Sequence, residues 1–286
     1  MSASLSADER LTANRSELKY RISVPQARAI AKVFDERLER HRFTGPGANR
    51  LPGARHYVTT VYFDTADGRL FADAQAQAGS LKVRAKEYYD QHVALTEVAR
   101  DRSALFRASP VLWVELKETS GHRSGKRRIG IPKRDINSFF AHGTITEELL
   151  EIQRREYGED ASKVIDALRE VCLRFDSPLR ASALVNYRRS AWQGEGQTVR
   201  VTIDRNLAFF APPHDLWESA PGLERNLLGP AVGEEQGCVL EVKSVGPLPA
   251  WLVDTLRAED AAPARFSKFV AASSAVASAA NGSHPS

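Results

Sequence analysis

Charged residues alternate with mostly apolar ones in at least six short segments of the sequence, and these residues are the candidates for chemistry. In the first segment, residues 15–22, every second side chain is charged. Successive side chains of a β-strand point in opposite directions, so a strand here would direct all its charges to one face. The charged faces of the six segments carry, in chain order, Arg15, Glu17, Lys19 and Arg21; Lys82, Arg84 and Lys86; Glu115 and Lys117; Arg189; Arg200, Thr202 and Asp204; and Glu241 and Lys243.

A single strand of this kind is typical of an ordinary half-solvated sheet. Six of them are harder to explain in that way, because like charges on adjacent strands repel one another. The pattern therefore favours strands that close into a barrel with their charged faces inward, where a bound polyanion would relieve the repulsion.

Length and composition fit a globular protein that could form one large β domain or two smaller domains. The chain has 286 residues, of which 42% are hydrophobic and 27% are charged, as in soluble globular proteins. Its net charge of +4 favours anionic partners without identifying them.

The sequence predicts a cytoplasmic protein without a transmembrane segment. Cys172 and Cys238 are its two cysteines and lie far apart, which excludes a disulfide-rich secreted scaffold. Residues 1–14 contain no apolar core of signal-peptide length. No apolar run approaches the roughly 18 residues that a membrane span requires.

The remaining segments predict how the charged strands are positioned. Residues 1–13 are expected to be a disordered lead, and residues 273–286 a tail rich in Ala and Ser. Periodic apolar residues predict a helical insertion at about 136–175. An amphipathic helix is expected to begin near Pro25.

Several common catalytic chemistries are excluded. Residues 121–127 superficially resemble a phosphate-binding P-loop, but the two glycines are one residue too close and Arg127 replaces the hydroxyl residue that would bind magnesium. The seven histidines and two cysteines show no zinc-ligand spacing, and the sequence has no Gly-x-Ser-x-Gly elbow. A classical nucleophile is therefore not expected.

Nine short motifs between residues 14 and 272 carry a resemblance to a known family. In chain order they are Arg15-x-Glu17-x-Lys19-Tyr20, Val61-Tyr62-Phe63-Asp64-Thr65, Lys82-Val83-Arg84, Glu115-Leu116-Lys117, Lys126-Arg127-Arg128, Tyr187-x-Arg189-x-Ala191-Trp192, Val199-Arg200-Val201-Thr202-Ile203-Asp204, Leu240-Glu241-Val242-Lys243 and Ser267-Lys268. Each motif is weak alone, whereas nine in the same order are specific. Together they resemble the VTC domain, the polyphosphate polymerase branch of the triphosphate tunnel metalloenzymes and a relative of the CYTH phosphatases. The resemblance is to the bacterial type of this domain, which stands alone.

The resemblance implies a single domain over residues 14–272, with an α+β fold that is mainly antiparallel β. Eight strands would form a closed tunnel barrel with helices packed outside, and a basic lumen would hold a tri- or polyphosphate. Interior and exterior residues alternate along barrel strands, so the implied fold agrees with the inward-facing charges inferred above.

The resemblance also implies the residues of the site. The implied catalytic residues are Lys19, Arg84, Arg189, Arg200 and Glu241. The implied phosphate-binding residues are Lys82, Lys117, Lys126, Arg128, Tyr187, Ser267 and Lys268, with the choice between Lys126 and Arg128 left open. Mn²⁺ or Mg²⁺ is the implied cofactor; Glu241 would be its principal ligand, and Glu17 and Glu115 are further candidates, since hard cations need only one or two carboxylates.

The activity implied is transfer of the γ-phosphate of ATP onto a growing polyphosphate chain. Two alternatives stay open, namely a tri- or polyphosphate hydrolase and a non-catalytic module that binds polyphosphate or nucleotide. CYTH phosphatases begin with Glu-x-Glu-x-Lys, and Arg15 in place of the first glutamate weakens the case for hydrolysis. Glu241 weakens the case for a pure binding module. The expected partners are ATP and inorganic tri- or polyphosphate, and no nucleic acid is expected.

Overall fold

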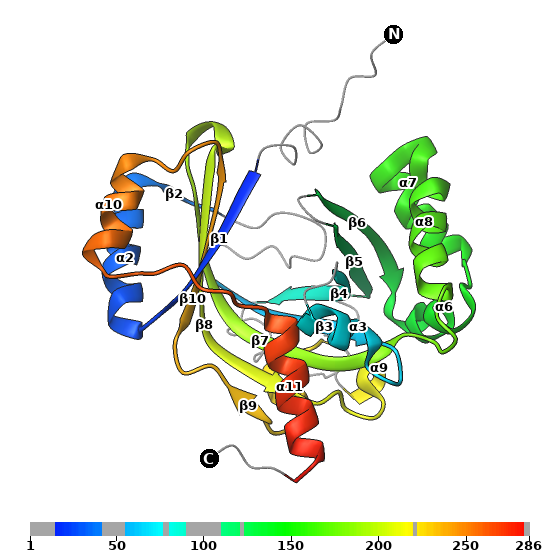
Figure 1. The fold of residues 1–286 in the computed structure, drawn as a ribbon. Coiled ribbons are helices and arrows are strands. Elements are labelled where there is room, and N and C mark those ends of the chain that lie inside the picture. The colour runs from blue at the N-terminus through cyan, green and yellow to red at the C-terminus, as the bar shows by residue number, and fades with distance from the viewer. Residues whose placement is uncertain are drawn as a thin grey trace, which may run out of the picture.

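One antiparallel sheet forms the centre of the molecule. The computed structural model describes residues 15–41, 55–76, 80–89, 110–120, 123–219 and 222–282, so the predicted lead lies outside the described residues. Eight strands follow one another in the sheet in the order β1-β10-β8-β7-β3-β4-β5-β6 (Figure 1). They span Arg15–Ile22 (β1), Arg55–Asp64 (β3), Ser80–Tyr89 (β4), Val111–Ser120 (β5), Arg123–Pro132 (β6), Arg180–Gln193 (β7), Val199–Phe210 (β8) and Cys238–Val245 (β10). The short strands β2 (Glu39–Arg40) and β9 (Gly233–Glu234) pair with β7 and β8.

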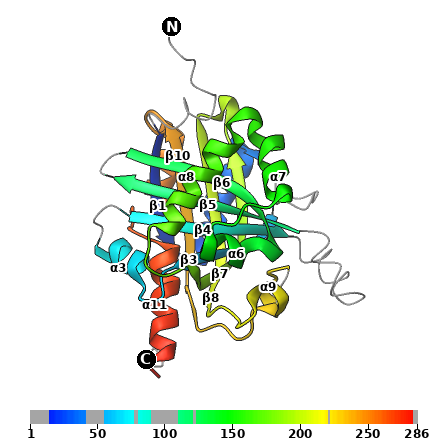
Figure 2. The same ribbon diagram turned by 90° about the vertical axis from the view of Figure 1, so that its right-hand side faces the viewer.

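Helices surround the curved sheet, which confirms the predicted α+β class. They span Val24–Arg37 (α2), Arg69–Ala76 (α3), Ile136–His142 (α6), Glu147–Tyr157 (α7), Ala161–Leu173 (α8), Leu216–Ser219 (α9), Ala250–Ala258 (α10) and Lys268–Ala280 (α11). Helices α6, α7 and α8 occupy the segment where the helical insertion was expected and stand beside β5 and β6, whereas α2 and α10 lie beyond β1 and β10 (Figures 1 and 2). No helix in the described part of the chain is both long and apolar enough to cross a bilayer.

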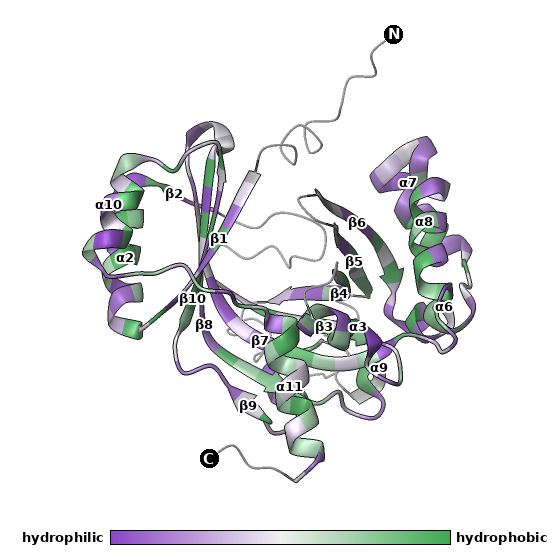
Figure 3. Ribbon diagram, viewed as in Figure 1, coloured by the Kyte–Doolittle hydropathy of each residue, from purple (hydrophilic) through white to green (hydrophobic). Residues whose placement is uncertain are grey.

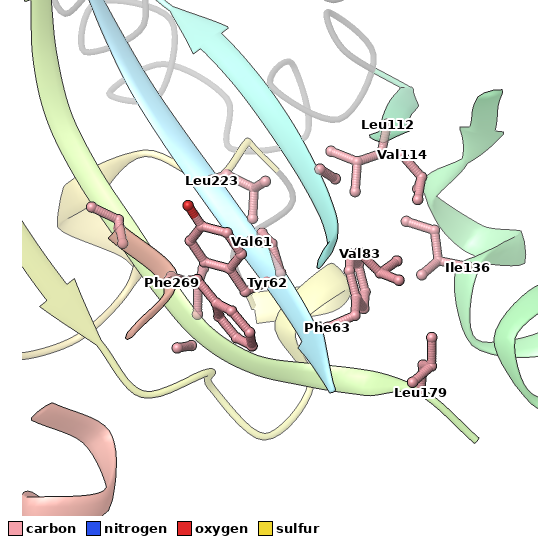
Figure 4. Packing of buried hydrophobic residues seen from close by; sticks show 14 of the residues in the cluster. Val61, Tyr62, Phe63, Val83, Leu112, Val114, Ile136, Leu179, Leu223 and Phe269 are labelled. Carbon is pink, nitrogen blue, oxygen red and sulfur yellow. The ribbon is translucent and has the colours of Figure 1, made fainter. Parts of the chain in front are cut away.

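Two apolar clusters fill the space between the sheet and its helices. The larger one includes Phe63 of β3, Ile136 of α6 and Phe269 of α11 (Figure 4). The smaller one joins β1, β8 and β10 to Phe34 of α2 and Leu252 of α10. Hydrophobic and hydrophilic residues alternate along the strands (Figure 3). Because alternate strand residues enter the clusters, the charged residues between them point to the opposite, inner face.

The C-terminal helix α11 packs against the sheet. Its N-cap residue Ser267 accepts a hydrogen bond from the Val270 N–H at 3.4 Å. Phe269 and Ala272 are buried, and the helix lies against β7 and β8 (Figure 1). The predicted boundary between domain and tail, at residue 273, falls inside this helix.

The predicted closure of the barrel is not confirmed. Among the described residues, the ladder of β1 is with β10 and that of β6 is with β5, and no hydrogen bonds join β1 to β6. The outer edge of β1 is occupied by the chain that leads to α11. There the Ala264 N–H donates to the Lys19 carbonyl at 2.7 Å, and Tyr20 forms an isolated bridge with Pro263.

Helix α7 covers the outer edge of β6. The buried side chain of Gln153 accepts from the Gly130 N–H at 3.2 Å and donates to the Gly130 carbonyl at 2.7 Å. The Tyr157 hydroxyl donates to the Arg128 carbonyl at 2.7 Å. Both edges of the sheet thus have partners already, which is the physical reason that β1 and β6 do not pair with each other.

Gln153→Leu is expected to destabilise the chain by roughly 1–3 kcal/mol, because it leaves the buried N–H and carbonyl of Gly130 without partners. Urea unfolding followed by circular dichroism measures the change. Arg155→Leu on the exposed side of the same helix is the control and should alter stability by less than about 0.5 kcal/mol. Equal effects of the two substitutions would contradict the role given to Gln153.

Candidate functional site

The inner face of the sheet encloses a small cavity with a strong positive charge. Its volume is about 100 Å³, and side chains from β1, β3, β4, β5, β7, β10 and the start of α11 line it. They are Glu17, Lys19, Thr60, Tyr62, Lys82, Arg84, Lys86, Lys117, Tyr187, Arg189, Glu241, Lys243, Ser267, Lys268 and Phe269. Eight of these residues are lysine or arginine and two are glutamate, which leaves an excess of six formal positive charges.

The register and curvature of the sheet explain why these side chains meet. Residues directly opposite each other on neighbouring strands point to the same face. Lys19 lies opposite Glu241, and Lys82 lies opposite Lys117. The sheet curves far enough to bring its two ends together, since Nζ of Lys117 in β5 lies 3.6 Å from Oε2 of Glu17 in β1.

Glu115 holds three basic side chains beside the cavity. Its carboxylate accepts a hydrogen bond from Nε of Arg84 at 2.9 Å, and lies 2.7 Å from Nζ of Lys126 and 3.8 Å from Nζ of Lys86. Burial acts to raise the pKa of Glu115, but the three cations, led by Lys86, hold that pKa well below its usual range. Glu115 therefore stays ionised. Its contacts fit the role of orienting its basic neighbours better than the role of a metal ligand.

Two other carboxylates, Glu17 and Glu241, reach the cavity itself. Glu241 lies 2.5 Å from Nζ of Lys243, and Glu17 lies 3.2 Å from Nζ of Lys19. Burial acts to raise the pKa of Glu241, but the surrounding cations, Lys243 first, hold it well below its usual range. Burial and Glu241 likewise act to raise the pKa of Glu17, and Lys243, Lys19 and Lys117 together lower it. Both groups are therefore available as anionic oxygen ligands.

This pair of carboxylates fits a hard divalent cation that also binds phosphate. Mg²⁺ and similar cations are held in phosphate-handling enzymes by one or two carboxylates together with phosphate oxygens and waters. A cation beside Glu17 and Glu241 would relieve the repulsion between them. The described residues contain no group of three or more His, Cys, Asp or Glu side chains that could hold a metal ion, so phosphate oxygens would have to complete the coordination shell.

A larger hollow of about 900 Å³ lies on the outside of the sheet, between α3, α9 and α11, and has a different character. Its lining contains three aspartates, three lysine or arginine residues and one histidine, so its formal charges balance when the histidine is neutral. One of the aspartates, Asp64, accepts hydrogen bonds from the N–H groups of Leu70 and Phe71 at 2.8 and 2.9 Å and thereby caps α3. The inner cavity, with its excess of basic residues, is therefore the candidate functional site.

Residues 14–277 match the family model of the VTC domain. The chain belongs to this family. A search of the curated proteins finds no match. Among solved structures, the chain is similar to the PH1819 protein from Pyrococcus horikoshii, with 13% identity, a TM-score of 0.39 and coverage of 90% of this chain and 94% of that one. It is also similar to a Bacillus halodurans protein described as a candidate adenylate cyclase, with 15% identity, a TM-score of 0.44 and coverage of 89% and 96%. Likeness of this degree says nothing about activity.

Most of the site residues that the sequence predicts lie at the cavity of this VTC domain. They are Glu17, Lys19, Lys82, Arg84, Lys117, Tyr187, Arg189, Glu241, Ser267 and Lys268. Lys126 and Glu115 form the ion pair described above, beside the lining. Arg200 lies on the same inner face, opposite Lys243 and Gln193, but is not among the lining residues.

The side chain of Arg128, another predicted site residue, points toward α7 and not toward the cavity. Its Nη2 lies 2.6 Å from Oε1 of Glu156 in α7, and its guanidinium lies 5.2 Å from the centre of the Trp113 ring. These contacts turn the side chain toward the helix that covers the sheet edge. Between Lys126 and Arg128, Lys126 is thus the one connected to the cavity, through Glu115.

Six residues of this site were not among the predicted site residues. Five of them line the cavity, namely Thr60, Tyr62, Lys86, Lys243 and Phe269, and the rings of Tyr62 and Phe269 stack with their centres 5.0 Å apart. The sixth, Asp204, pairs with the lining residue Lys268. The alternation of the strands already assigned Lys86, Lys243 and Asp204 to the charged face. The pattern alone could therefore have found these three, whereas the family motifs give them no role.

Lys82 predicts a pH dependence of anion binding in this VTC domain. Burial, together with the neighbouring Lys19 and Lys117, lowers the pKa of Lys82 to about 8. Binding of tripolyphosphate should therefore weaken roughly tenfold between pH 7 and pH 9, as this lysine loses its charge. Isothermal titration calorimetry at several pH values measures the effect. Lys82→Arg should flatten the profile, because a guanidinium keeps its proton; an unchanged profile would assign the dependence to another group.

The same shift has the opposite effect on the stability of the ligand-free chain. The pKa of Lys82 is lower in the folded state than its ordinary value of 10.5. Between about pH 8 and pH 10.5 the unfolded chain binds more protons than the folded chain, so stability should rise with pH in that range. A melting temperature that rises from pH 8 to pH 10 while tripolyphosphate affinity falls would show both consequences of one buried lysine.

Proposed function

We propose that this VTC domain is a metal-dependent polyphosphate polymerase that transfers the γ-phosphate of ATP onto a polyphosphate chain in the inner cavity. The observation that carries the proposal is the excess of six formal positive charges around a cavity of about 100 Å³. Such a cavity is complementary to the highly charged phosphates of a nucleotide or a phosphate chain, and charge-assisted hydrogen bonds to phosphate oxygens are among the strong ones.

In phosphoryl transfer the protein itself need not form covalent bonds with the substrate. The phosphate groups must be aligned and the charge that develops on their oxygens must be neutralised. Lys19, Arg84 and Arg189 supply this charge from three different strands, and Arg200 extends it along the inner face. The terminal phosphate of the acceptor chain is the nucleophile and ADP is the leaving group, so the transfer needs no nucleophilic side chain from the protein.

Neutral hydrogen-bond donors complete the proposed phosphate site. Burial raises the pKa of the Tyr187 hydroxyl far above its ordinary value, so this group keeps its proton and can donate it to a phosphate oxygen. The Ser267 hydroxyl lies 3.5 Å from Nζ of Lys82 at the same cavity. These residues would contact the phosphate chain together with Lys117, Lys126 and Lys268.

We further propose that Glu241, with Glu17, holds Mn²⁺ or Mg²⁺ when the substrate is bound. The cation supplies neutralisation of charge on phosphate oxygens. Glu115 is left out of this role because Arg84, Lys126 and Lys86 surround its carboxylate.

One incubation tests the proposal. The purified chain is given ATP and Mn²⁺; ADP, free phosphate and chain length on a denaturing gel are followed together. Polyphosphate ladders with release of ADP are expected. Free phosphate without chains would instead identify a hydrolase, in which water takes the place of the acceptor. Turnover of neither kind, with tripolyphosphate still raising the melting temperature, would identify a binding module.

A further inference from the structure

Asp204 of β8 is a completely buried carboxylate, with 0% of its surface exposed, that joins three parts of the fold. Its Oδ1 accepts a hydrogen bond from Nε of Arg189 in β7 at 2.6 Å, and its Oδ2 accepts one from Nη2 of the same guanidinium at 2.7 Å. Nζ of Lys268, the first residue of α11, lies 2.7 Å from Oδ2. One carboxylate therefore fixes two basic side chains that both line the cavity.

The two basic side chains also share an aromatic surface. The guanidinium carbon of Arg189 lies 5.2 Å from the centre of the Tyr187 ring, and Nζ of Lys268 lies 4.9 Å from it. Both distances are in the range of cation–π contacts. Asp204 and Tyr187 together thus define where these cations lie, and a bidentate carboxylate also fixes the plane of the guanidinium.

We propose that Asp204 is a positioning residue, which holds Arg189 and Lys268 so that their remaining N–H groups point at the bound phosphates. The inference rests on the proposed function, because it needs a phosphate group in the cavity. Asp204 itself does not touch the phosphate chain or its metal, since its two oxygens accept from three donors and are closed off from solvent.

Removing the charge of Asp204 has two opposing effects on anion binding. Loss of a negative charge near an anion site would by itself strengthen binding of the anion. Loss of the anchor would weaken binding, because an asparagine has one acceptor oxygen and its amide N–H groups would face the Arg189 and Lys268 donors. Burial acts to lower the pKa of Lys268, with Asp204 opposing it, so Lys268 would also lose its proton more easily. We expect the loss of the anchor for Arg189 and Lys268 to have the larger effect, so that anion binding weakens.

Glu17 offers a matched comparison in the same cavity. Its carboxylate is partly exposed and pairs with Lys19, Lys117 and Lys243 at 3.2, 3.6 and 3.8 Å. These lysines need no anchor of this kind, because about a third of each side chain is exposed to water. For Glu17 the loss of charge should therefore dominate, and Glu17→Gln should strengthen metal-free binding of the anion.

The test is calorimetric titration of the full chain with tripolyphosphate in the presence of a chelator. Asp204→Asn is expected to weaken binding roughly 10- to 100-fold, as expected for hydrogen bonds to charged groups. Glu17→Gln is expected to strengthen it about 2- to 5-fold. Glu87→Gln disrupts the buried ion pair with Lys133 on the outer face, where Nζ and Oε2 lie 2.9 Å apart; it should lower stability and leave the affinity unchanged.

A double-mutant cycle with Lys268→Met separates positioning from a general loss of stability. If Asp204 acts through Lys268 and Arg189, Asp204→Asn should cost less affinity in the Lys268→Met background than in the wild-type chain. Fully additive losses, or an affinity that is unchanged or raised in Asp204→Asn, would overturn the inference.

The remaining outcomes are also decisive. Failure of the wild-type chain to bind tripolyphosphate would overturn the proposed function and this inference with it. Normal wild-type binding without an effect of Asp204→Asn would overturn the inference alone. If Asp204→Asn does not fold, the inference is tested in the wild-type chain by nuclear magnetic resonance, from the rate at which the Nε proton of Arg189 exchanges with water. Slow exchange of this proton with water is expected, and fast exchange would contradict the anchor.

Discussion

Replacing Lys19 with methionine is expected to weaken tripolyphosphate binding roughly 10- to 100-fold, the effect of a lost charge-assisted hydrogen bond. Lys19 lies in the middle of β1, lines the cavity, and lies opposite Glu241. Its ammonium group donates to the Phe266 carbonyl at 3.2 Å and pairs with Glu17 at 3.2 Å. Turnover with ATP should fall at least as far, because correct alignment of the phosphates is lost along with affinity.

The fold should tolerate this substitution well. About 30% of the Lys19 side chain is exposed, so water can replace the contact with the Phe266 carbonyl. Lys163→Met is the control, since that lysine is 83% exposed on α8 and pairs with the nearby Asp160. Calorimetry and thermal unfolding of both variants are compared. Wild-type affinity in Lys19→Met would show that the inner cavity is not where the anion binds.

Glu241→Gln is expected to raise the Mn²⁺ concentration needed for half-maximal turnover by at least about 100-fold. Loss of an outer-shell partner of a metal ligand already costs 10- to 100-fold in metal affinity or activity, and loss of a carboxylate ligand should cost more. The side chain of Glu241 is 13% exposed and lies among cations, which hold its pKa well below the usual range and keep it ionised. In the absence of metal the same substitution should strengthen binding of tripolyphosphate, because it removes a negative charge from the cavity.

Glu118→Gln is the matched control for Glu241→Gln. Glu118 lies on β5, is 42% exposed, and pairs with Arg127 and Arg174. Its neutralisation should leave the metal titration unchanged. An unchanged metal titration for Glu241→Gln would assign this glutamate to a structural ion pair with Lys243 and leave the metal site to other residues.

The inner charged face could be predicted from the sequence because it depends on local geometry. The side-chain period of a strand is two, so a row of alternating charges such as Lys82, Arg84 and Lys86 must share a face wherever the strand lies. The family motifs then indicated that the six segments face a common anion. The mainly antiparallel α+β fold and the membership of the VTC domain family follow from the same residues and are confirmed.

The edges of the sheet could not be predicted in this way. Whether β1 pairs with β6 depends on what else competes for their backbone groups, and the competitors come from distant segments. Gln153 of α7 binds the backbone of Gly130, and Ala264 binds the backbone of Lys19. No local pattern marks a glutamine inside a helix as the partner of a strand edge, so closure was predicted where the structure has two covered edges.

The sequence by itself determined which residues face inward and that their charge suits a polyanion, because strand alternation is a local property. The tertiary structure alone decided which charges meet. It turned Arg128 toward Glu156 of α7, since that helix lies over the edge of β6. It also placed Lys268 against Asp204, although 64 positions separate them in the chain, because α11 packs beneath β7 and β8. Ion pairs act over a few ångströms, so their partners are set by how the sheet curves and where the helices pack.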